Sequence, residues 1–222
     1  MNKMKVSIMS GVSIDGKLSL KRGITSGSIN GYLSQACMVE LHRWRGIFNA
    51  ILVGGTTVAI DNPSLTARYP GATNPIRVII GPEGNVPLSS KVFDVTEADT
   101  ILAVTSKTDK QYVEAVKEKG VDVFVAGDGD YVNYKDLLNY LENKGIKHLM
   151  VEGGGTINWL MLEQGLVDDI YIFTVPIVTG AVSAPTFVEG PAGKEMEDPV
   201  VLEWVDGKNL DGVPFNHYLV KK

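Results

Sequence analysis

The chain has 222 residues, enough for one large α/β domain or two small ones with a buried core. Its formal net charge of −5 argues against a broad nucleic-acid surface, and no apolar run is long enough to span a bilayer. The single cysteine, Cys37, excludes an intrachain disulfide and a cysteine-based zinc site, and is expected in the core. We therefore expect a cytoplasmic protein with neither nucleic acid nor membrane among its partners.

Apolar runs bounded by turn residues alternate with helical patterns along most of the chain. Several runs are continuous, as in strands covered on both faces. They predict strands at 5–10, 50–53, 77–80, 100–104, 122–125, 147–151 and 169–175. Helical spacing with start and stop signals predicts helices at 34–44, 109–119, 134–144 and 156–164. This alternation indicates a largely parallel sheet with helices on both faces.

The tail of the chain has a different pattern, with prolines at 176, 185, 191 and 199 and several glycines. Two further strands, 200–205 and 215–220, are separated by Asp206-Gly207 and by residues 211–214. They are expected to form an antiparallel hairpin on the sheet edge. No linker, repeat or low-complexity tract divides the chain, so we predict an α/β fold in a single domain, 1–222.

The most informative segment joins a strand to a helix through three glycines. The apolar run ends at Glu152, and Gly153–Gly155 precede a helix start. Glycines let the chain turn sharply and let a ligand approach, while free N–H groups at a helix start favour phosphate. This turn predicts a site for a phosphorylated ligand such as a nucleotide; a tight turn without a ligand is the alternative. Glu152 would repel a phosphate, so it is expected to have a separate role.

A second buried strand runs into Gly54-Gly55, then hydroxyl residues and the turn signal Asp61-Asn62-Pro63. Thr57 could bond a cofactor phosphate or cap the turn, and Asp61 could likewise cap it. Arg68 suits a phosphate, because its guanidinium forms two parallel hydrogen bonds; an exposed arginine without a partner is the alternative.

A third segment, Ser13–Lys17, contains the tight-turn signal Asp15-Gly16. Lys17 follows the turn and, taken alone, would be interpreted as a solvated lysine. The three histidines have no second ligand at metal spacing and no nucleophile signature, so no metal is predicted. The sequence also lacks a P-loop lysine motif and the H-x-E…P-C-x-x-C deaminase signature.

Taken together, these segments resemble the riboflavin-pathway reductases. That family comprises the archaeal and fungal diaminopyrimidine reductases and the C-terminal reductase domain of the bacterial bifunctional deaminase-reductase. The resemblance covers nearly the whole chain, in the stretches 13–17, 45, 54–58, 61–63, 65–68, 74–78, 152–156, 165–168 and 184–186.

The resemblance implies a dihydrofolate-reductase-like fold, NADPH as hydride donor and a homodimer. The implied reaction reduces the ribosyl group of a (ribosylamino)pyrimidinone 5′-phosphate to ribityl in riboflavin biosynthesis. The missing deaminase signature favours the 2,5-diamino substrate over the deaminated 5-amino-6-(5-phosphoribosylamino)uracil. The alternatives are another pterin- or folate-type reductase on this fold and a non-catalytic NADP-binding regulator.

The resemblance also implies three groups of site residues. The expected cofactor contacts are Thr57, Asp61, Gly81, Gly153, Gly154, Gly155, Thr156, Ile157 and Asn158. The expected substrate contacts are Ser28, Arg45, Leu65, Arg68 and Glu152, with the two arginines on the 5′-phosphate. Ser28 lies in residues 23–32, where the chain departs from the family pattern. The residues expected nearest the chemistry, as the catalytic set, are Lys17, Asp61 and Glu152.

Overall fold

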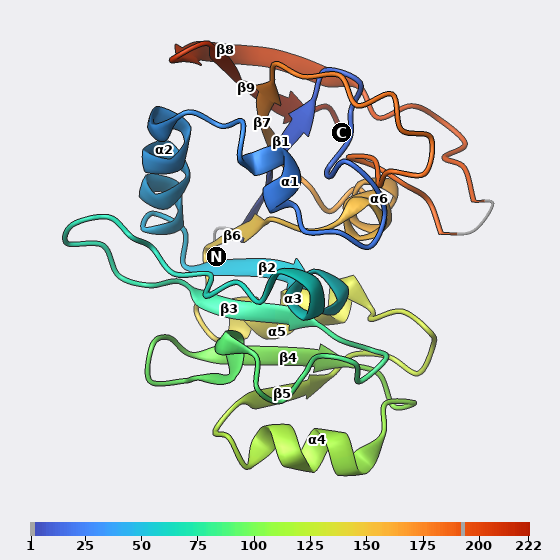
Figure 1. Cartoon of the computed structure of the whole chain (residues 1–222). Helices are drawn as coiled ribbons and strands as arrows, with labels where there is room; N and C mark the ends of the chain where they lie inside the picture. Colours follow the sequence, from blue (N-terminus) through green and yellow to red (C-terminus); the bar gives the residue numbers. More distant parts are fainter. Residues whose placement is uncertain (1–2, 192–193) are drawn as a thin grey trace. The chain divides into compact units, whose positions relative to one another are not determined.

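The computed structural model describes residues 3–191 and 194–222 and has the predicted α/β architecture (Figure 1). The chain divides into two compact units. The first contains residues up to Met4 and His42–Met150, and the second contains Lys5–Leu41 and Val151–Lys222. The interpretation of the chain as a single domain stays a prediction. Among the described residues, no helix has the length and apolar character needed to cross a bilayer.

The sheet of the first unit is built from the continuous apolar runs. Its strand order is β5-β4-β3-β2-β6 (Figure 1). The pairs β2–β3, β3–β4 and β4–β5 are all parallel. Every residue of β4 is buried, which explains why this run lacks the alternation of a half-exposed strand. The strands are β2 (Ala50–Gly54), β3 (Ile76–Ile80), β4 (Thr100–Val104), β5 (Asp122–Val125) and β6 (His148–Val151), whose last residue belongs to the second unit.

Helices of the first unit begin at the capping residues that the sequence carries. Helix α4 (Lys110–Lys117) follows Asp109, whose carboxylate accepts a first-turn N–H at 2.8 Å. Helix α5 (Tyr134–Asn143) follows Asn133, whose Oδ1 accepts two such N–H groups at 3.1 and 3.2 Å. Both predicted helices are confirmed. The remaining helical segments are α3 (Gly55–Asp61) and the 3-10 turn η1 (Lys91–Phe93).

A buried arginine links β3 to the loop that follows it. Arg77 is 0% exposed, and its Nε donates to Thr100 Oγ1 at 2.9 Å. Its terminal nitrogens donate to four backbone carbonyls at 2.5–3.5 Å. Burial lowers the pKa of Arg77, and the negative charges of nearby acidic residues oppose that shift. Three of these carbonyls belong to Lys91, Asp94 and Ala98, so the Arg77 side chain connects the loop 91–98 to β3.

In the second unit the strand order is β1-β7-β9-β8. Strands β1 and β7 are parallel, whereas β7–β9 and β9–β8 are antiparallel. The predicted C-terminal antiparallel hairpin is therefore confirmed. The elements are β1 (Lys5–Ser13), α1 (Gly27–Asn30), α6 (Gly155–Glu163), β7 (Asp169–Val175), β8 (Leu202–Leu210) and β9 (Val213–Val220); α2 (Gln35–Arg45) begins in this unit and ends in the first.

The hairpin differs from the prediction in length and in the position of its turn. Strand β8 continues through Asp206-Gly207, which was expected to separate two strands. The connection is Asp211-Gly212, where φ is +52° and +92°, as a two-residue hairpin turn requires. A bulge between Trp204 and Asp206 changes the register of β8. The short helices α1 and α3 were not predicted as helices, because four and seven residues show little periodicity.

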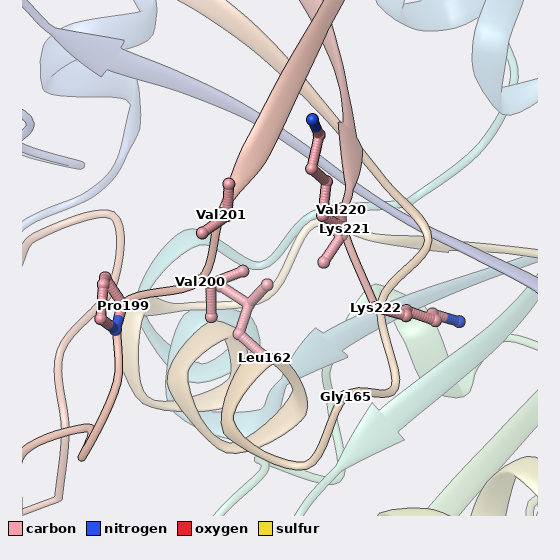
Figure 2. Close-up of a pocket in the computed structure, with 8 residues that line it drawn as sticks. All are labelled: Leu162, Gly165, Pro199, Val200, Val201, Val220, Lys221 and Lys222. Carbon is pink, nitrogen blue, oxygen red and sulfur yellow. The ribbon is translucent and has the colours of Figure 1, made fainter.

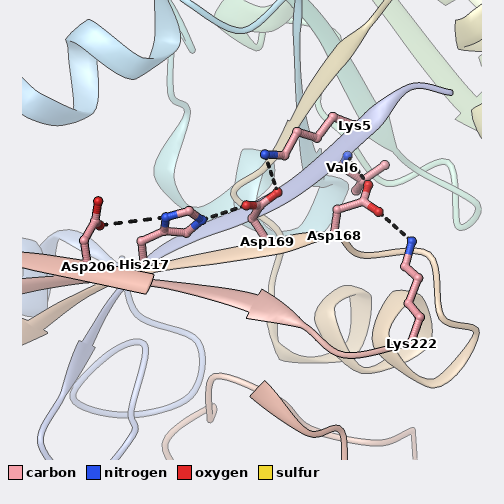
Figure 3. A network of polar contacts seen from close by, with 7 residues as sticks. All are labelled: Lys5, Val6, Asp168, Asp169, Asp206, His217 and Lys222. Atoms are coloured by element: carbon pink, nitrogen blue, oxygen red, sulfur yellow. Dashed lines mark hydrogen bonds and ion pairs between the residues drawn. The ribbon is translucent and has the colours of Figure 1, made fainter. Parts of the chain in front are cut away.

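A network of polar side chains joins β1, β7 and β9 in the second unit (Figure 3). Asp169 is 0% exposed, and its carboxylate oxygens lie 2.9 Å from Lys5 Nζ and 2.7 Å from His217 Nε2. The ring of His217 stacks on Tyr171, with centroids 4.3 Å apart. The buried carboxylate is thus held by two basic side chains, one of which is 48 residues away in the sequence.

Candidate active site

The predicted site residues form two groups, one in each unit. In the first unit they are Arg45, Thr57, Asp61, Leu65, Arg68 and Gly81. In the second they are Lys17, Ser28, Glu152, Gly153, Gly154, Gly155, Thr156, Ile157 and Asn158.

Two glycines of the first unit follow the carboxyl ends of adjacent parallel strands. Gly54, the last residue of β2, is aligned with Ile80, the last residue of β3. Gly55 and Gly81 come directly after these positions. A Cβ on Gly55 would lie 3.0 Å from the Ile80 carbonyl oxygen, and one on Gly81 would lie 3.0 Å from Leu102 Cδ1. Small residues at the carboxyl ends of parallel strands are typical of nucleotide sites in α/β proteins.

Helix α3 carries the two other cofactor candidates of this unit. Thr57 lies in its first turn and Asp61 is its last residue; both are half-buried. Asn62 ends the helix in the left-handed conformation, with φ +42°, and its Oδ1 accepts the Lys91 N–H at 2.9 Å. The chain is thus helical from Gly55 to Asp61, so Thr57 and Asp61 lie on one short helix directly after β2.

The substrate candidates of the first unit lie after α3 and at the end of α2. Leu65 is 2% exposed and has φ +54°, a conformation that a branched side chain rarely adopts. Arg68 is exposed, and its backbone N–H donates to His42 Nδ1 at 3.3 Å. Arg45 is the half-buried last residue of α2. The strained backbone at Leu65 singles out this loop, because such strain is concentrated at ligand sites.

The glycine turn of the second unit leaves no room for a side chain at Gly153 or Gly155. A Cβ on Gly153 would lie 2.6 Å from Asn158 Oδ1, and one on Gly155 would lie 2.4 Å from the Thr186 carbonyl oxygen. Gly154 is extended at the N-cap of α6, with φ −156° and ψ 165°. The half-buried Glu152 stands just before this turn. Backbone N–H groups at the start of α6 can therefore approach an anion without interference from side chains.

Asn158 supports the turn from inside the protein. It is 2% exposed, and its Nδ2 donates to the Phe187 carbonyl at 2.8 Å. This bond fixes the amide so that Oδ1 lies against Gly153, and Oδ1 has no hydrogen-bond partner in the part of the chain that the structure describes. Asn158, expected as a cofactor contact, thus has a structural bond to residues 185–189 as well.

Lys17 follows a turn that is held by a chain of hydrogen bonds. Its N–H donates to Ser13 Oγ at 2.9 Å, and that hydroxyl donates to Asp15 at 2.6 Å. Asp15 also accepts the N–H groups of Thr179 and Gly180 at 3.1 and 2.9 Å. The Ser13 hydroxyl, followed by these loop donors, holds the pKa of Asp15 well below its usual range. The turn dipeptide therefore also anchors a distant loop.

Residues 185–189 bring the Lys17 turn and the glycine turn together within the second unit. On one side, the Leu18 N–H donates to the Pro185 carbonyl at 2.9 Å, and Lys17 forms a β-bridge with Thr186. On the other side, the Glu189 N–H donates to the Gly155 carbonyl at 3.1 Å. The sequence of this segment predicts no role for it, and its one signal is the stretch 184–186 that matches the family.

Two other predictions concern side chains outside these turns. The Ser28 Oγ accepts the Leu20 N–H at 3.1 Å, so this hydroxyl already bonds the neighbouring loop. Among the described residues, no group of three acidic, histidine or cysteine side chains is suited to a metal ion.

The fold and the glycine turns define a protein of the α/β class with glycines at the carboxyl ends of its strands, where α/β proteins commonly bind their ligands. The chain belongs to the RibD C-terminal domain family, which it matches over residues 4–206. It is 40% identical over 214 residues, 95% of each chain, to the 2,5-diamino-6-ribosylamino-4(3H)-pyrimidinone 5′-phosphate reductase of Aquifex aeolicus. An enzyme of the same name from Methanothermobacter thermautotrophicus is 33% identical over 89% of each chain.

Other relatives are longer, and solved structures agree in fold. The riboflavin biosynthesis protein RibD of Chlamydia trachomatis is 34% identical over 81% of this chain, which spans 48% of that protein. A pyrimidine reductase-like protein from Corynebacterium diphtheriae superposes with a TM-score of 0.84 at 20% identity, covering 100% and 93% of the two chains. Dihydrofolate reductase from Enterococcus faecalis gives a TM-score of 0.50 at 16% identity, covering 98% and 97%. The predicted dihydrofolate-reductase-like fold and the family resemblance are confirmed.

Proposed function

We propose that the chain is a 2,5-diamino-6-ribosylamino-4(3H)-pyrimidinone 5′-phosphate reductase of riboflavin biosynthesis that uses NADPH. The observation that carries the proposal is 40% identity to the Aquifex reductase over 95% of both chains. A second relative that the chain covers by 89% has the same name. The deaminated 5-amino-6-(5-phosphoribosylamino)uracil is the second candidate substrate, because the family resemblance implies either compound.

The residues present fit a phosphorylated dinucleotide. Gly153 and Gly155 have no space for a Cβ, so only backbone lines the turn before α6. Bound there, NADPH would supply a hydride. Gly153–Asn158 are the residues we assign to its phosphates, and Thr57, Asp61 and Gly81 are the other proposed cofactor contacts.

The substrate's sugar carbon is reduced after the N-glycoside opens. Opening transfers a proton to the ring oxygen and leaves an imine; addition of one hydride to carbon and one proton to nitrogen then gives the ribityl amine. This reaction needs a proton donor and a group that stabilises a cationic imine. Lys17, Asp61 and Glu152 are the set we assign to these tasks, with the carboxylates suited to the cation and the ammonium suited to donate a proton.

Binding of the substrate would depend on positively charged protein side chains that contact its phosphate. Arg45 and Arg68 are suited to the 5′-phosphate, because a guanidinium can donate two parallel hydrogen bonds to it. Leu65, Ser28 and Glu152 are the other proposed substrate contacts. A neutral pterin would have no need of these arginines, so their importance for KM separates the two kinds of reductase. We also propose a cytoplasmic homodimer.

The test follows NADPH absorbance with purified protein and either the diamino or the deaminated ribosylaminopyrimidine phosphate. We expect oxidation with the diamino compound at the higher kcat/KM. Faster oxidation with the uracil would move the assignment to the second candidate. NADPH binding without oxidation of either compound would refute the enzyme and favour a non-catalytic regulator.

A further inference from the structure

The glycine turn before α6 is sterically open to an anion, but two carboxylates border it. Glu152 stands directly before the turn, and Glu189 lies beside it. The Glu189 N–H donates to the Gly155 carbonyl at 3.1 Å, and a Cβ on Gly155 would lie 3.0 Å from Glu189 Cβ. A carboxylate near the start of a helix interacts with the positive end of the helix dipole and repels a second anion. An unpaired Glu189 would therefore compete with a phosphate for this turn.

The carboxylate of Glu189 is held close to the turn by its own segment. Its Oε2 accepts the Thr186 N–H at 3.4 Å. The carbonyl oxygen of the same threonine would lie 2.4 Å from a Cβ on Gly155, the first residue of α6. The side chain of Glu189 is only 34% exposed, so solvent screens its charge in part. The position of this negative charge is thus fixed beside the start of the helix.

Arg22 neutralises this carboxylate from the loop that follows Lys17. Its Nη2 forms an ion pair with Glu189 Oε1, across a separation of 167 residues in the sequence. The loop is itself held in place, because the Ser28 Oγ accepts the Leu20 N–H at 3.1 Å. A guanidinium suits this position, since it keeps its charge at any ordinary pH and pairs well with a carboxylate. The ion pair therefore removes most of the repulsion that Glu189 would exert on an anion at the turn.

Helix α6 itself is held by its packing. Residues 157–162 are all buried. At the far end of the helix, Leu162 approaches Val200 in an apolar groove (Figure 2). Lys221 and Lys222 also line this groove, so their charges lie at the opposite end of the helix from the glycine turn. The charge that an anion meets at the start of α6 is therefore set by the loops around the turn.

We propose that Arg22 is a positioning residue for the cofactor, which by pairing with Glu189 leaves the start of α6 to the cofactor's diphosphate. The inference rests on the NADPH site proposed above and adds a residue to it. The first bond within α6 joins the Asn158 N–H to the Gly154 carbonyl at 3.0 Å, so the N–H groups of residues 155–157 have no partner inside the helix. Arg22 acts through Glu189 and not through a contact of its own with the phosphates. Because NADPH and NADH share the diphosphate, both should depend on Arg22 equally.

The test is a fluorescence titration of the full chain with NADPH, which measures Kd without turnover. Arg22→Gln leaves Glu189 unpaired and should raise Kd about 10-fold, as expected of one partly screened charge near the phosphates. The double variant R22Q/E189Q removes both charges and should restore the wild-type Kd. Arg22→Lys keeps the positive charge and should bind nearly as tightly as the wild type. The control is Lys117→Gln, which breaks an exposed ion pair of the first unit and should leave Kd unchanged.

An Arg22→Gln variant with the wild-type Kd would overturn the inference. So would a double variant as weak as the single one, because Arg22 would then act without Glu189. Thermal melting identifies variants that fail to fold; if Arg22→Gln is one of them, Glu189→Gln decides, since it should bind NADPH at least as tightly as the wild type and weaker binding would overturn the inference.

NADPH oxidation by the same wild-type preparation tests the proposed function separately. An active wild type whose Kd is unaffected by Arg22→Gln refutes the role of Arg22 alone. The expected pattern of Kd values without oxidation in the presence of either pyrimidine refutes the reductase alone.

Discussion

Replacement of Gly155 by alanine tests whether the glycine turn is as tight as the structure has it. The new Cβ would lie 2.4 Å from the Thr186 carbonyl oxygen and 3.0 Å from Glu189 Cβ. Ordinary contact begins at 3.4 Å, so the carbonyl would have to move by 3.4 − 2.4 = 1.0 Å. Such overpacking costs about 1–3 kcal/mol, and the lower entropy of the unfolded alanine chain returns about 0.4–1 kcal/mol. We expect a net loss of about 1–2 kcal/mol.

That loss corresponds to a fall in Tm of roughly 2–8 °C for a chain of this size. Calorimetry measures it, with Gly129→Ala as the control, because a Cβ at Gly129 would have no neighbour closer than 3.9 Å. Titration with NADPH gives a second measurement: if the turn holds the cofactor, movement of the backbone should weaken binding in Gly155→Ala only. A variant with the Tm and NADPH affinity of the control would refute both the packing argument and the assignment of the turn.

Four other variants test separate residues. Arg77→Met should lower the free energy of unfolding in urea by at least about 3 kcal/mol, since four backbone carbonyls lose their charged donor; a loss below about 1 kcal/mol would contradict this. Asp15 has a lowered pKa, so its bonds stabilise the fold above the unfolded value of about 4 and this contribution disappears as pH falls. The stability difference between wild type and Asp15→Asn should therefore narrow between about pH 5 and pH 2, and a constant difference would refute the linkage. Arg68→Ala should raise KM for the phosphorylated substrate about 10–100-fold, the value of a charged hydrogen bond, and an unchanged KM would remove it from the phosphate site. Glu152→Gln should keep NADPH affinity and reduce kcat; loss of NADPH binding instead would place Glu152 at the cofactor.

Elements with long periodic or continuous apolar patterns could be predicted from the sequence. The buried strand at 100–104 has the predicted bounds, and the helix at 134–143 ends within one residue of its predicted end. Shorter or irregular elements could not be predicted in this way. Asp206-Gly207 has the composition of a hairpin turn, but in the structure these residues pair with β9 and the chain turns at Asp211-Gly212. Local composition permits both positions, and pairing with the distant strand selects one.

Candidate site residues could be identified from the sequence because glycines and charged residues stand at strand ends. Their surroundings could not, since these depend on residues far away in the chain. Nothing local predicts that Leu65 adopts a positive φ, or that Asn158 bonds the Phe187 carbonyl. Similarly, His217 has no acidic neighbour at a recognisable spacing in the sequence. In the structure, its Nε2 lies within hydrogen-bond distance of Asp169 on the adjacent strand β7.

The sequence by itself determined the α/β class, most element positions and the family, because periodicity, turn residues and motif spacing are local properties. Only the tertiary structure decided that residues 185–189 join the Lys17 turn to the glycine turn, and that His217 lies beside Asp169. Both arrangements follow from strand register and from backbone contacts between distant segments. The free energy of such contacts depends on which segments meet, and that is a property of the folded chain as a whole.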